Sequence, residues 1–197
     1  MHTSSIDPVT EIASAVAAYR DTANLAALLV QLERIAAAAD PEALAAAVEP
    51  FRDMPEVSGP VYERIVAQRP DDARALVILA TAYWLSGRGP DRVGELATRA
   101  IAADPENRGA WHLWALTESD LRSRVARWQQ VAARFPADDL ARANLADNAA
   151  SLATTEDDDA ALVLAIQSYE SLLATATRSE QRVALERAIR ALRGWRL

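Results

Sequence analysis

The sequence predicts an all-α protein built as a stack of antiparallel helix pairs, and two observations carry this prediction. Apolar residues recur at intervals of three and four along almost the whole chain, and no segment shows the period-two alternation of a strand. Prolines recur as well, since Pro70, Pro105 and Pro136 stand at intervals of 35 and 31 residues, each between two helical patterns. A repeat of this length that contains two helices is typical of an α-solenoid.

The pattern predicts about ten or eleven helices. Their expected ranges are 8–19, 22–38, 41–52, 59–68, 71–86, 91–103, 107–119, 122–134, 138–152, 158–175 and 179–193. Three of the starts carry an aspartate followed by proline, at residues 7–8, 40–41 and 104–105. Aspartate caps the first free amides of a helix, and proline suits its first turn.

The joints between these helices are short, which is typical of antiparallel neighbours. One joint is expected at 154–157, and the loosest loop is expected at 53–60, which ends in Gly59 and Pro60. No long linker interrupts the pattern, so we expect a single helical-repeat domain over 1–197. Within it, 8–57 is expected to hold degenerate helices or a cap, 58–177 the repeats and 178–197 a capping helix.

The composition bounds the class of function. The chain has 197 residues, of which 51% are hydrophobic, enough for one sizeable core. It has no cysteine, which excludes disulfides and thiolate catalysis and makes the cytoplasm the expected compartment. Its net charge of −7 argues against nonspecific nucleic-acid binding. The N-terminus lacks a secretory pattern, and the longest apolar run, 75–85, is far short of the roughly 20 residues that span a bilayer.

A bulky residue recurs at one place on every second helix. Tyr62 and Trp128 each stand eight residues before a repeat proline, Ala97 takes the same place as a smaller residue, and Tyr169 stands eight before Thr177. The clearest repeat unit is 71–105. Its first helix carries a large, a large, a small and an aromatic residue in that order, namely Leu76, Leu79, Ala80 and Tyr83.

On these residues the chain resembles the tetratricopeptide repeat (TPR) family over about 58–193. The resemblance implies a right-handed superhelix and a non-catalytic scaffold that binds a peptide or a partner's helix in a concave groove. The groove residues that it implies are Arg74, Val77, Thr81, Trp84, His112, Leu116, Asn144, Asp147 and Asn148, with Gly109 at the entrance. Val77 and Ala143 stand where a chaperone-tail clamp would need basic residues, so such a clamp is not expected. Trp84 is open to two interpretations, a binding hot spot or packing between repeats.

No residue cluster predicts catalysis, a cofactor or a metal. His112 is the only histidine outside the extreme N-terminus, and a lone histidine makes no zinc site. An enzyme would need acids such as Glu118 or Asp120 to converge on it. The acidic run 156–159 is interpreted as a helix start, where carboxylates complement the helix dipole.

The favoured function is therefore an interaction scaffold or adaptor whose partner is another protein or a peptide, without nucleic acid or membrane insertion. The alternative is an integral subunit of a stable multiprotein complex or a homo-oligomer. The sequence leaves open the oligomeric state, the partner, and whether the N-terminal helices fill the groove.

Overall fold

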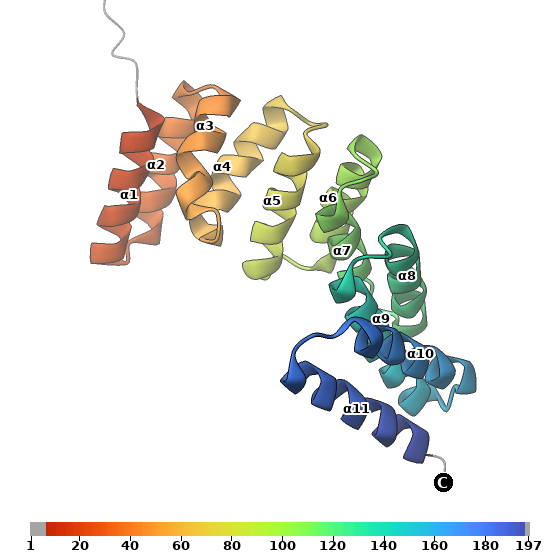
Figure 1. Ribbon diagram of the computed structural model, residues 1–197. Helices are drawn as coiled ribbons and strands as arrows, with labels where there is room; N and C mark the ends of the chain where they lie inside the picture. The colour runs from red at the N-terminus through yellow and green to blue at the C-terminus, as the bar shows by residue number, and fades with distance from the viewer. Residues whose placement is uncertain (1–6, 196–197) are drawn as a thin grey trace, which may run out of the picture. The chain divides into compact units, whose positions relative to one another are not determined.

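A computed structural model describes residues 7–195, and within them all regular structure is helical, as predicted (Figure 1). The contacts of the chain divide it into two compact units, with the boundary in the sequence between Leu113 and Trp114. Unit 1 contains α1 (Pro8–Thr22), α2 (Leu25–Ala38), α3 (Pro41–Val48), the short 3-10 helix η1 (Glu49–Phe51), α4 (Pro55–Gln68), α5 (Ala73–Leu85) and α6 (Pro90–Ala103). Unit 2 contains α8 (Leu121–Arg134), α9 (Asp139–Glu156), α10 (Asp159–Thr175) and α11 (Ser179–Gly194), and α7 (Arg108–Leu116) runs across the boundary.

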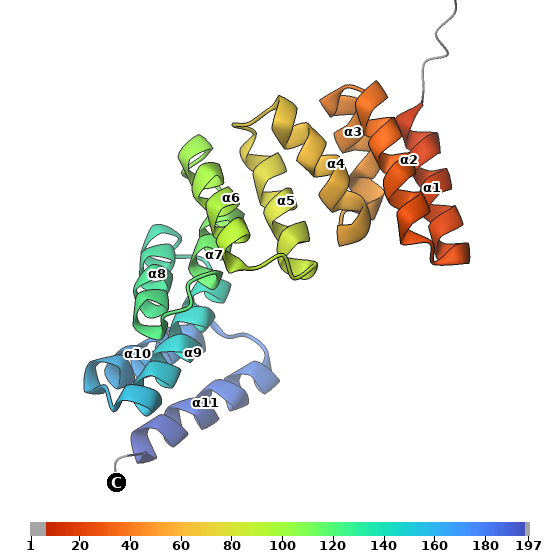
Figure 2. The same ribbon diagram turned by 180° about the vertical axis from the view of Figure 1, so that it is seen from behind.

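Unit 1 consists of successive helix pairs. Helices α1 and α2 pack together, α1 also packs on α3 and α2 on α4, and α5 packs between α4 and α6 (Figure 2). Large aliphatic side chains fill the space between them, and many are fully buried, among them Ile12, Leu32, Leu44, Val61 and Leu76. The division of 1–197 into a cap, repeats and a capping helix stays a prediction.

The most apolar stretch of the chain forms helix α5. Because α4 lies on one side of it and α6 on another, residues around most of its circumference are buried, namely Ala75, Leu76, Ile78, Leu79, Ala80 and Ala82. A helix with apolar residues on nearly all sides is expected where neighbours cover it from more than one direction.

In unit 2, helices α8, α9, α10 and α11 pack consecutively, each on the one before it. Their shared core includes Trp128, Val131, Leu145 and Leu172, all at most 6% exposed. Helix α11 is attached more lightly, since Ile189 is its one buried residue within 179–194.

The recurring position of the repeats is a packing position. Tyr62, Ala97 and Trp128 are each at most 2% exposed, and Tyr169 is half-buried. The side chain therefore faces the interior in successive second helices, as the sequence period indicates.

Aspartates begin most of the helices. The carboxylates of Asp7 and Asp40 accept hydrogen bonds from the first amides of α1 and α3, as predicted. Asp72, Asp138 and Asp158 cap α5, α9 and α10 in the same way.

The predicted cap at Asp104–Pro105 is wrong, although the predicted helix start at 107 lies within one residue of the observed one. The Asp104 carboxylate accepts a hydrogen bond from the amide of Glu106 and closes a turn. Helix α7 begins three residues later, where the side-chain oxygen of Asn107 accepts a hydrogen bond from the Ala110 amide at 3.2 Å.

The predicted loose loop at 53–60 is also wrong. Helix α4 begins at Pro55 and continues through Pro60, and Val57, Ser58 and Gly59 are buried. In a helix, a proline clashes with the backbone N–H and the Cβ of the residue before it and with the carbonyl four residues earlier, and glycine before the proline removes the Cβ part of this clash. Gly59 has no Cβ, so the pair Gly59–Pro60 can remain helical while burial of the segment favours the helix. Likewise, α9 extends through the expected joint to Glu156 and ends only at Asp157, which has a φ of 54°.

Candidate functional site: a groove on the first unit

The candidate site is a groove along one side of α5 in unit 1. A cavity of about 430 Å³ lies there, lined by Arg52, Asp53, Arg74, Val77, Ile78, Thr81 and Asn107. Three predicted groove residues, Arg74, Val77 and Thr81, belong to this lining, because residues spaced by three and four share one face of a helix. Helices α1 and α2 contribute no residue to it.

Arginines mark one end of the groove. Arg52 follows η1 and Arg74 lies in the first turn of α5, and both bind the same carboxylate, that of Glu49. The Arg52 Nη1 atom lies 3.0 Å from Glu49 Oε1, and the Arg74 Nη2 atom lies 3.3 Å from Oε2. The carboxylate thus joins two elements that are far apart in sequence.

A second cavity of about 350 Å³ adjoins this end, since Arg74 lines both cavities and Glu49 lines the second. The α4 residues Tyr62 and Ile65 form part of its wall. Burial of the phenol, with the negative charge of Glu49 as a smaller cause, raises the pKa of Tyr62. The ion pair between Glu49 and Arg74 therefore stands between two cavities.

The middle of the groove is apolar. Val77 is half-buried and Ile78 is 9% exposed, while the Thr81 hydroxyl donates a hydrogen bond to the Val77 carbonyl at 2.8 Å. Because that bond satisfies the hydroxyl, Thr81 presents mainly its methyl group. Trp84, one turn further along α5, is 40% exposed. His112 lies in α7 and is half-buried.

Unit 2 holds the remaining predicted residues. Leu116, at the end of α7, is 37% exposed. On α9, Asn144 and Asn148 donate hydrogen bonds to carbonyls one turn earlier, and Asp147 accepts one from the Tyr169 hydroxyl at 2.5 Å. Burial, the larger cause, and that bond raise the pKa of Tyr169. These polar groups already have partners within unit 2.

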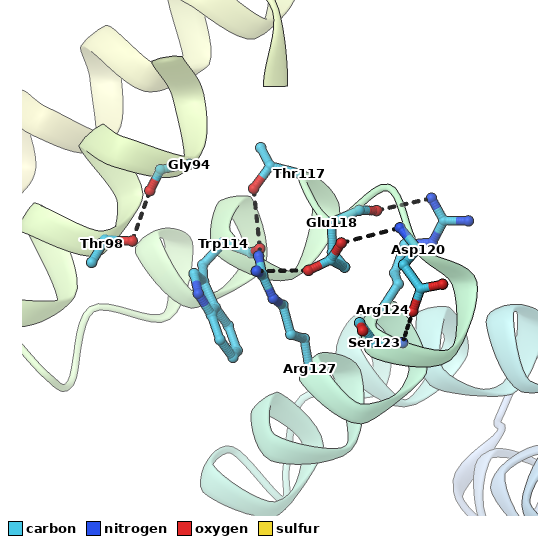
Figure 3. Close-up of polar contacts among 9 residues, drawn as sticks. All are labelled: Gly94, Thr98, Trp114, Thr117, Glu118, Asp120, Ser123, Arg124 and Arg127. Carbon is cyan, nitrogen blue, oxygen red and sulfur yellow. Dashed lines mark hydrogen bonds and ion pairs between the residues drawn. The ribbon is translucent and has the colours of Figure 1, made fainter. Parts of the chain in front are cut away.

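A network of arginines holds the C-terminal end of α7 to α8 (Figure 3). The Arg127 guanidinium lies 4.6 Å from the centre of the Trp114 ring, donates a hydrogen bond to the Trp114 carbonyl and pairs with Glu118 at 2.7 Å. Arg124 donates to the Glu118 carbonyl and to the side-chain oxygen of Asn148. Arg127, by binding the Trp114 carbonyl, satisfies part of the C-terminal end of α7 and opposes its negative dipole.

The two acids that an enzyme would need have other roles. Glu118 is held by Arg127, and Asp120 caps α8 by accepting a hydrogen bond from the Ser123 amide at 2.8 Å. Over residues 7–195, no group of three or more histidine and carboxylate side chains is placed to hold a metal ion. In the same range, no helix combines the length and the hydropathy that crossing a bilayer requires.

Four residues of the cavity lining were not predicted from the sequence: Arg52, Asp53, Ile78 and Asn107. Ile78 lies in α5 itself, whereas the other three come from the segments before α4 and before α7. The repeat register of 41–57 is too weak to place Arg52 and Asp53. The sequence offers a signal for Asn107 only, since residues 104–107 have the composition of a turn before a helix. In the structure, Asn107 lines the same cavity as the residues of α5.

The fold defines the class of protein. No protein-family model matches the sequence, and no curated protein sequence matches it significantly. Solved structures do share its fold. A thermophilic TPR protein of Thermus thermophilus is 19% identical, with a TM-score of 0.56 over 92% of this chain and 98% of that one. The MamA protein is 13% identical, with a TM-score of 0.60 over 87% of this chain and 97% of the other.

A MamA double mutant designated RS-1 is similar in the same way, with 16% identity and a TM-score of 0.54 over 94% of this chain and 98% of the other. At these identities the likeness shows the fold alone. The chain is therefore a TPR-like helical repeat protein, as its sequence predicted. Proteins with this fold generally serve protein–protein interaction, because stacked repeats present extended surfaces to a partner.

Proposed function

We propose that this protein is a non-catalytic interaction scaffold that binds a peptide or a partner's helix in the groove along α5. The observation that supports it best is the cavity of about 430 Å³ that Arg74, Val77 and Thr81 line together. Binding sites commonly combine a concave, mainly apolar wall with a few polar groups that fix orientation. Here Val77 and Ile78 supply the wall, and Arg52, Arg74 and Asn107 supply the polar groups.

The residues of unit 2 are a weaker part of this proposal. Asn144, Asp147 and Asn148 would have to exchange their present hydrogen bonds for bonds to a partner, at a cost in affinity. Trp84 and Leu116 are exposed enough to contribute apolar contact. We further propose the cytoplasm as the compartment, on the absence of cysteine.

A pair of threonine variants tests the groove. Thr81 and Thr98 are both exposed, and each hydroxyl donates to the carbonyl one turn earlier at 2.8 Å; Figure 3 shows this bond for Thr98. Thr81→Trp places an indole in the cavity, whereas Thr98→Trp places one on α6, outside the lining. We expect wild type and Thr98→Trp to retain the same partner from a lysate of the native host, and Thr81→Trp to lose it. Equal retention by both variants would move the binding surface away from α5.

A second function, a subunit of a stable complex or a homo-oligomer, has an observation of its own. At the start of α2, Leu25, Leu29 and Val30 are 44%, 39% and 68% exposed. Adjacent exposed aliphatic side chains are typical of a surface that a partner covers. Light scattering on the purified chain tests this function, since a monomer at micromolar concentration would contradict the homo-oligomer.

A further inference from the structure

We propose that the groove recognises an acidic residue next to an aliphatic one in its partner, and that Glu49 occupies the acidic subsite in the free protein. This inference rests on the proposed function and assigns the chemistry of the bound segment. The carboxylate of Glu49 serves as an internal stand-in for the partner's carboxylate.

The subsite already binds a carboxylate. Arg52 and Arg74 each contact a different oxygen of Glu49, at 3.0 and 3.3 Å. A guanidinium carries five N–H donors in a planar fork, and Glu49 engages one nitrogen of each arginine. Both arginines therefore keep donors for a second ligand, and both line the larger cavity.

The internal contact is easily exchanged. Side chains of Arg74, Arg52 and Glu49 are 73%, 47% and 43% exposed. Ion pairs at such exposure contribute little to folding, because water and salt screen them. An incoming carboxylate can replace Glu49 without loss of arginine pairing, and the segment that carries it then adds apolar contact that Glu49 does not make.

The other residues that line the cavity determine which partner residue is preferred next to the acidic one. Val77 and Ile78 follow Arg74 along the same side of α5, so a side chain next to the bound acid faces an aliphatic wall. Asn107 lies at the same cavity and offers an amide to the partner's backbone. The lining carries two arginines and one aspartate, and Glu49 pairs with both arginines, so the charges balance as long as Glu49 stays bound to them. A segment whose carboxylate displaces Glu49 finds both arginines here, whereas a basic segment would have to bind Asp53 and Glu49 instead.

The experiment begins with a selection. Random 12-residue peptides are displayed and enriched on the full chain, and the affinity of the enriched peptides is then measured by fluorescence anisotropy. We expect the peptides to share an aspartate or glutamate within two residues of leucine, isoleucine or valine. Binding of the best peptide should be competed by its unlabelled form and weakened when its acid is changed to the amide.

Three variants of the chain then test whether Glu49 occupies the place of the partner's carboxylate. Arg74→Gln removes a ligand of the carboxylate and should raise the Kd of the peptide roughly tenfold. Glu49→Gln removes the internal competitor and should tighten the same peptide by roughly threefold to tenfold. Arg64→Gln, an exposed arginine of α4 outside this cavity, is the matched control and should change nothing. Circular dichroism confirms that each variant is folded.

Arg74→Gln and Glu49→Gln should change the Kd of the peptide in opposite directions. This difference distinguishes a role of the ion pair in recognition from a purely structural role. If the ion pair only braced η1 against α5, then Glu49→Gln and Arg74→Gln would weaken binding alike, and this inference would be wrong. The variant Thr81→Trp shows whether a peptide binds in the groove, because such a peptide should no longer bind this variant. If the peptides that bind in the groove share a basic residue, or no charged residue, this inference is wrong while the proposed function stands. If no peptide is enriched, both the proposed function and this inference fail.

Discussion

Gly109 approaches Val77 so closely that a Cβ atom at residue 109 would stand 3.3 Å from the Cγ1 atom of Val77. The glycine lies in the first turn of α7, and its backbone has no left-handed φ that would exclude alanine. Close approach of α7 to α5 therefore makes residue 109 a tight place for a larger side chain, and the contact lies beside the groove that Val77 lines.

A double-mutant cycle tests this contact. Gly109→Ala gains up to about 1 kcal/mol of helix propensity, which the tight contact with Val77 opposes. In a Val77→Ala background the contact is gone, so we expect Gly109→Ala to be more favourable there by about 0.5–1 kcal/mol. Urea denaturation followed by circular dichroism measures both differences. If Gly109→Ala changes the free energy of unfolding equally in both backgrounds, then contact with Val77 does not restrict the size of the side chain at residue 109.

The tryptophans of the chain should differ sharply in their contribution to stability. Trp128 is 2% exposed and Trp84 is 40% exposed. Trp128→Ala leaves a large cavity in the core of unit 2 and should lower the free energy of unfolding by about 3–5 kcal/mol. Trp84→Ala should cost less than about 1.5 kcal/mol. Far-ultraviolet circular dichroism is the readout, because fluorescence would change with the loss of either indole. Equal costs would contradict the assignment of Trp128 to the core.

Helix positions were largely predictable because each depends on neighbouring residues. Capping by Asp40 or Asp72 needs only the amides two or three residues later, and the apolar period of α5 is visible in its own sequence. The predictions failed where tertiary contact outweighed a local signal. Gly59–Pro60 has the sequence of a turn, yet burial of Val57 and Ser58 keeps the segment helical.

The groove was predictable only in part for the same reason. Arg74, Val77 and Thr81 share one helix, so their spacing alone places them together. Glu49 and Arg52 come from the preceding helix pair, and no period in the sequence relates them to Arg74. Their meeting depends on the packing of α3 and α4 against each other and of α4 against α5, which only the structure shows.

The Arg127 network predicts that lysine cannot replace arginine in unit 2. The planar guanidinium lies over the Trp114 ring, binds the Trp114 carbonyl and pairs with Glu118, whose side chain is only 18% exposed. Lysine keeps the charge but cannot stack and bind both oxygens at once. We expect Arg127→Lys to lower the free energy of unfolding by about 1–3 kcal/mol.

The exposed pair of Arg190 and Glu186 provides the control for that variant. These side chains are 68% and 44% exposed and lie 3.9 Å apart, so Arg190→Lys should change stability by less than about 0.5 kcal/mol. Urea denaturation of both variants gives the comparison. Equal, small effects would mean that the contacts of Arg127 contribute no more than a surface ion pair.

The capping aspartates predict the response of the protein to acid. Hydrogen bonds from backbone amides lower the pKa of Asp40, Asp120 and Asp158, chiefly those from Ala43, Ser123 and Ala161 respectively. A carboxyl whose pKa is lower in the folded state stabilises the fold above its unfolded pKa of about 3.9. That stabilisation is lost as the pH falls through the lower, folded value, so stability should decline below about pH 4.

Asparagine at these caps should flatten that decline. It still accepts the amide hydrogen bonds but does not ionise. A triple variant Asp40→Asn, Asp120→Asn, Asp158→Asn should therefore lose less of its melting temperature than wild type between about pH 5 and about pH 3. The control is Asp21→Asn, Asp53→Asn, Asp71→Asn, which changes the net charge equally but removes no cap. If both variants flatten the decline to the same extent, reduced net charge is the cause and the caps do not govern acid stability.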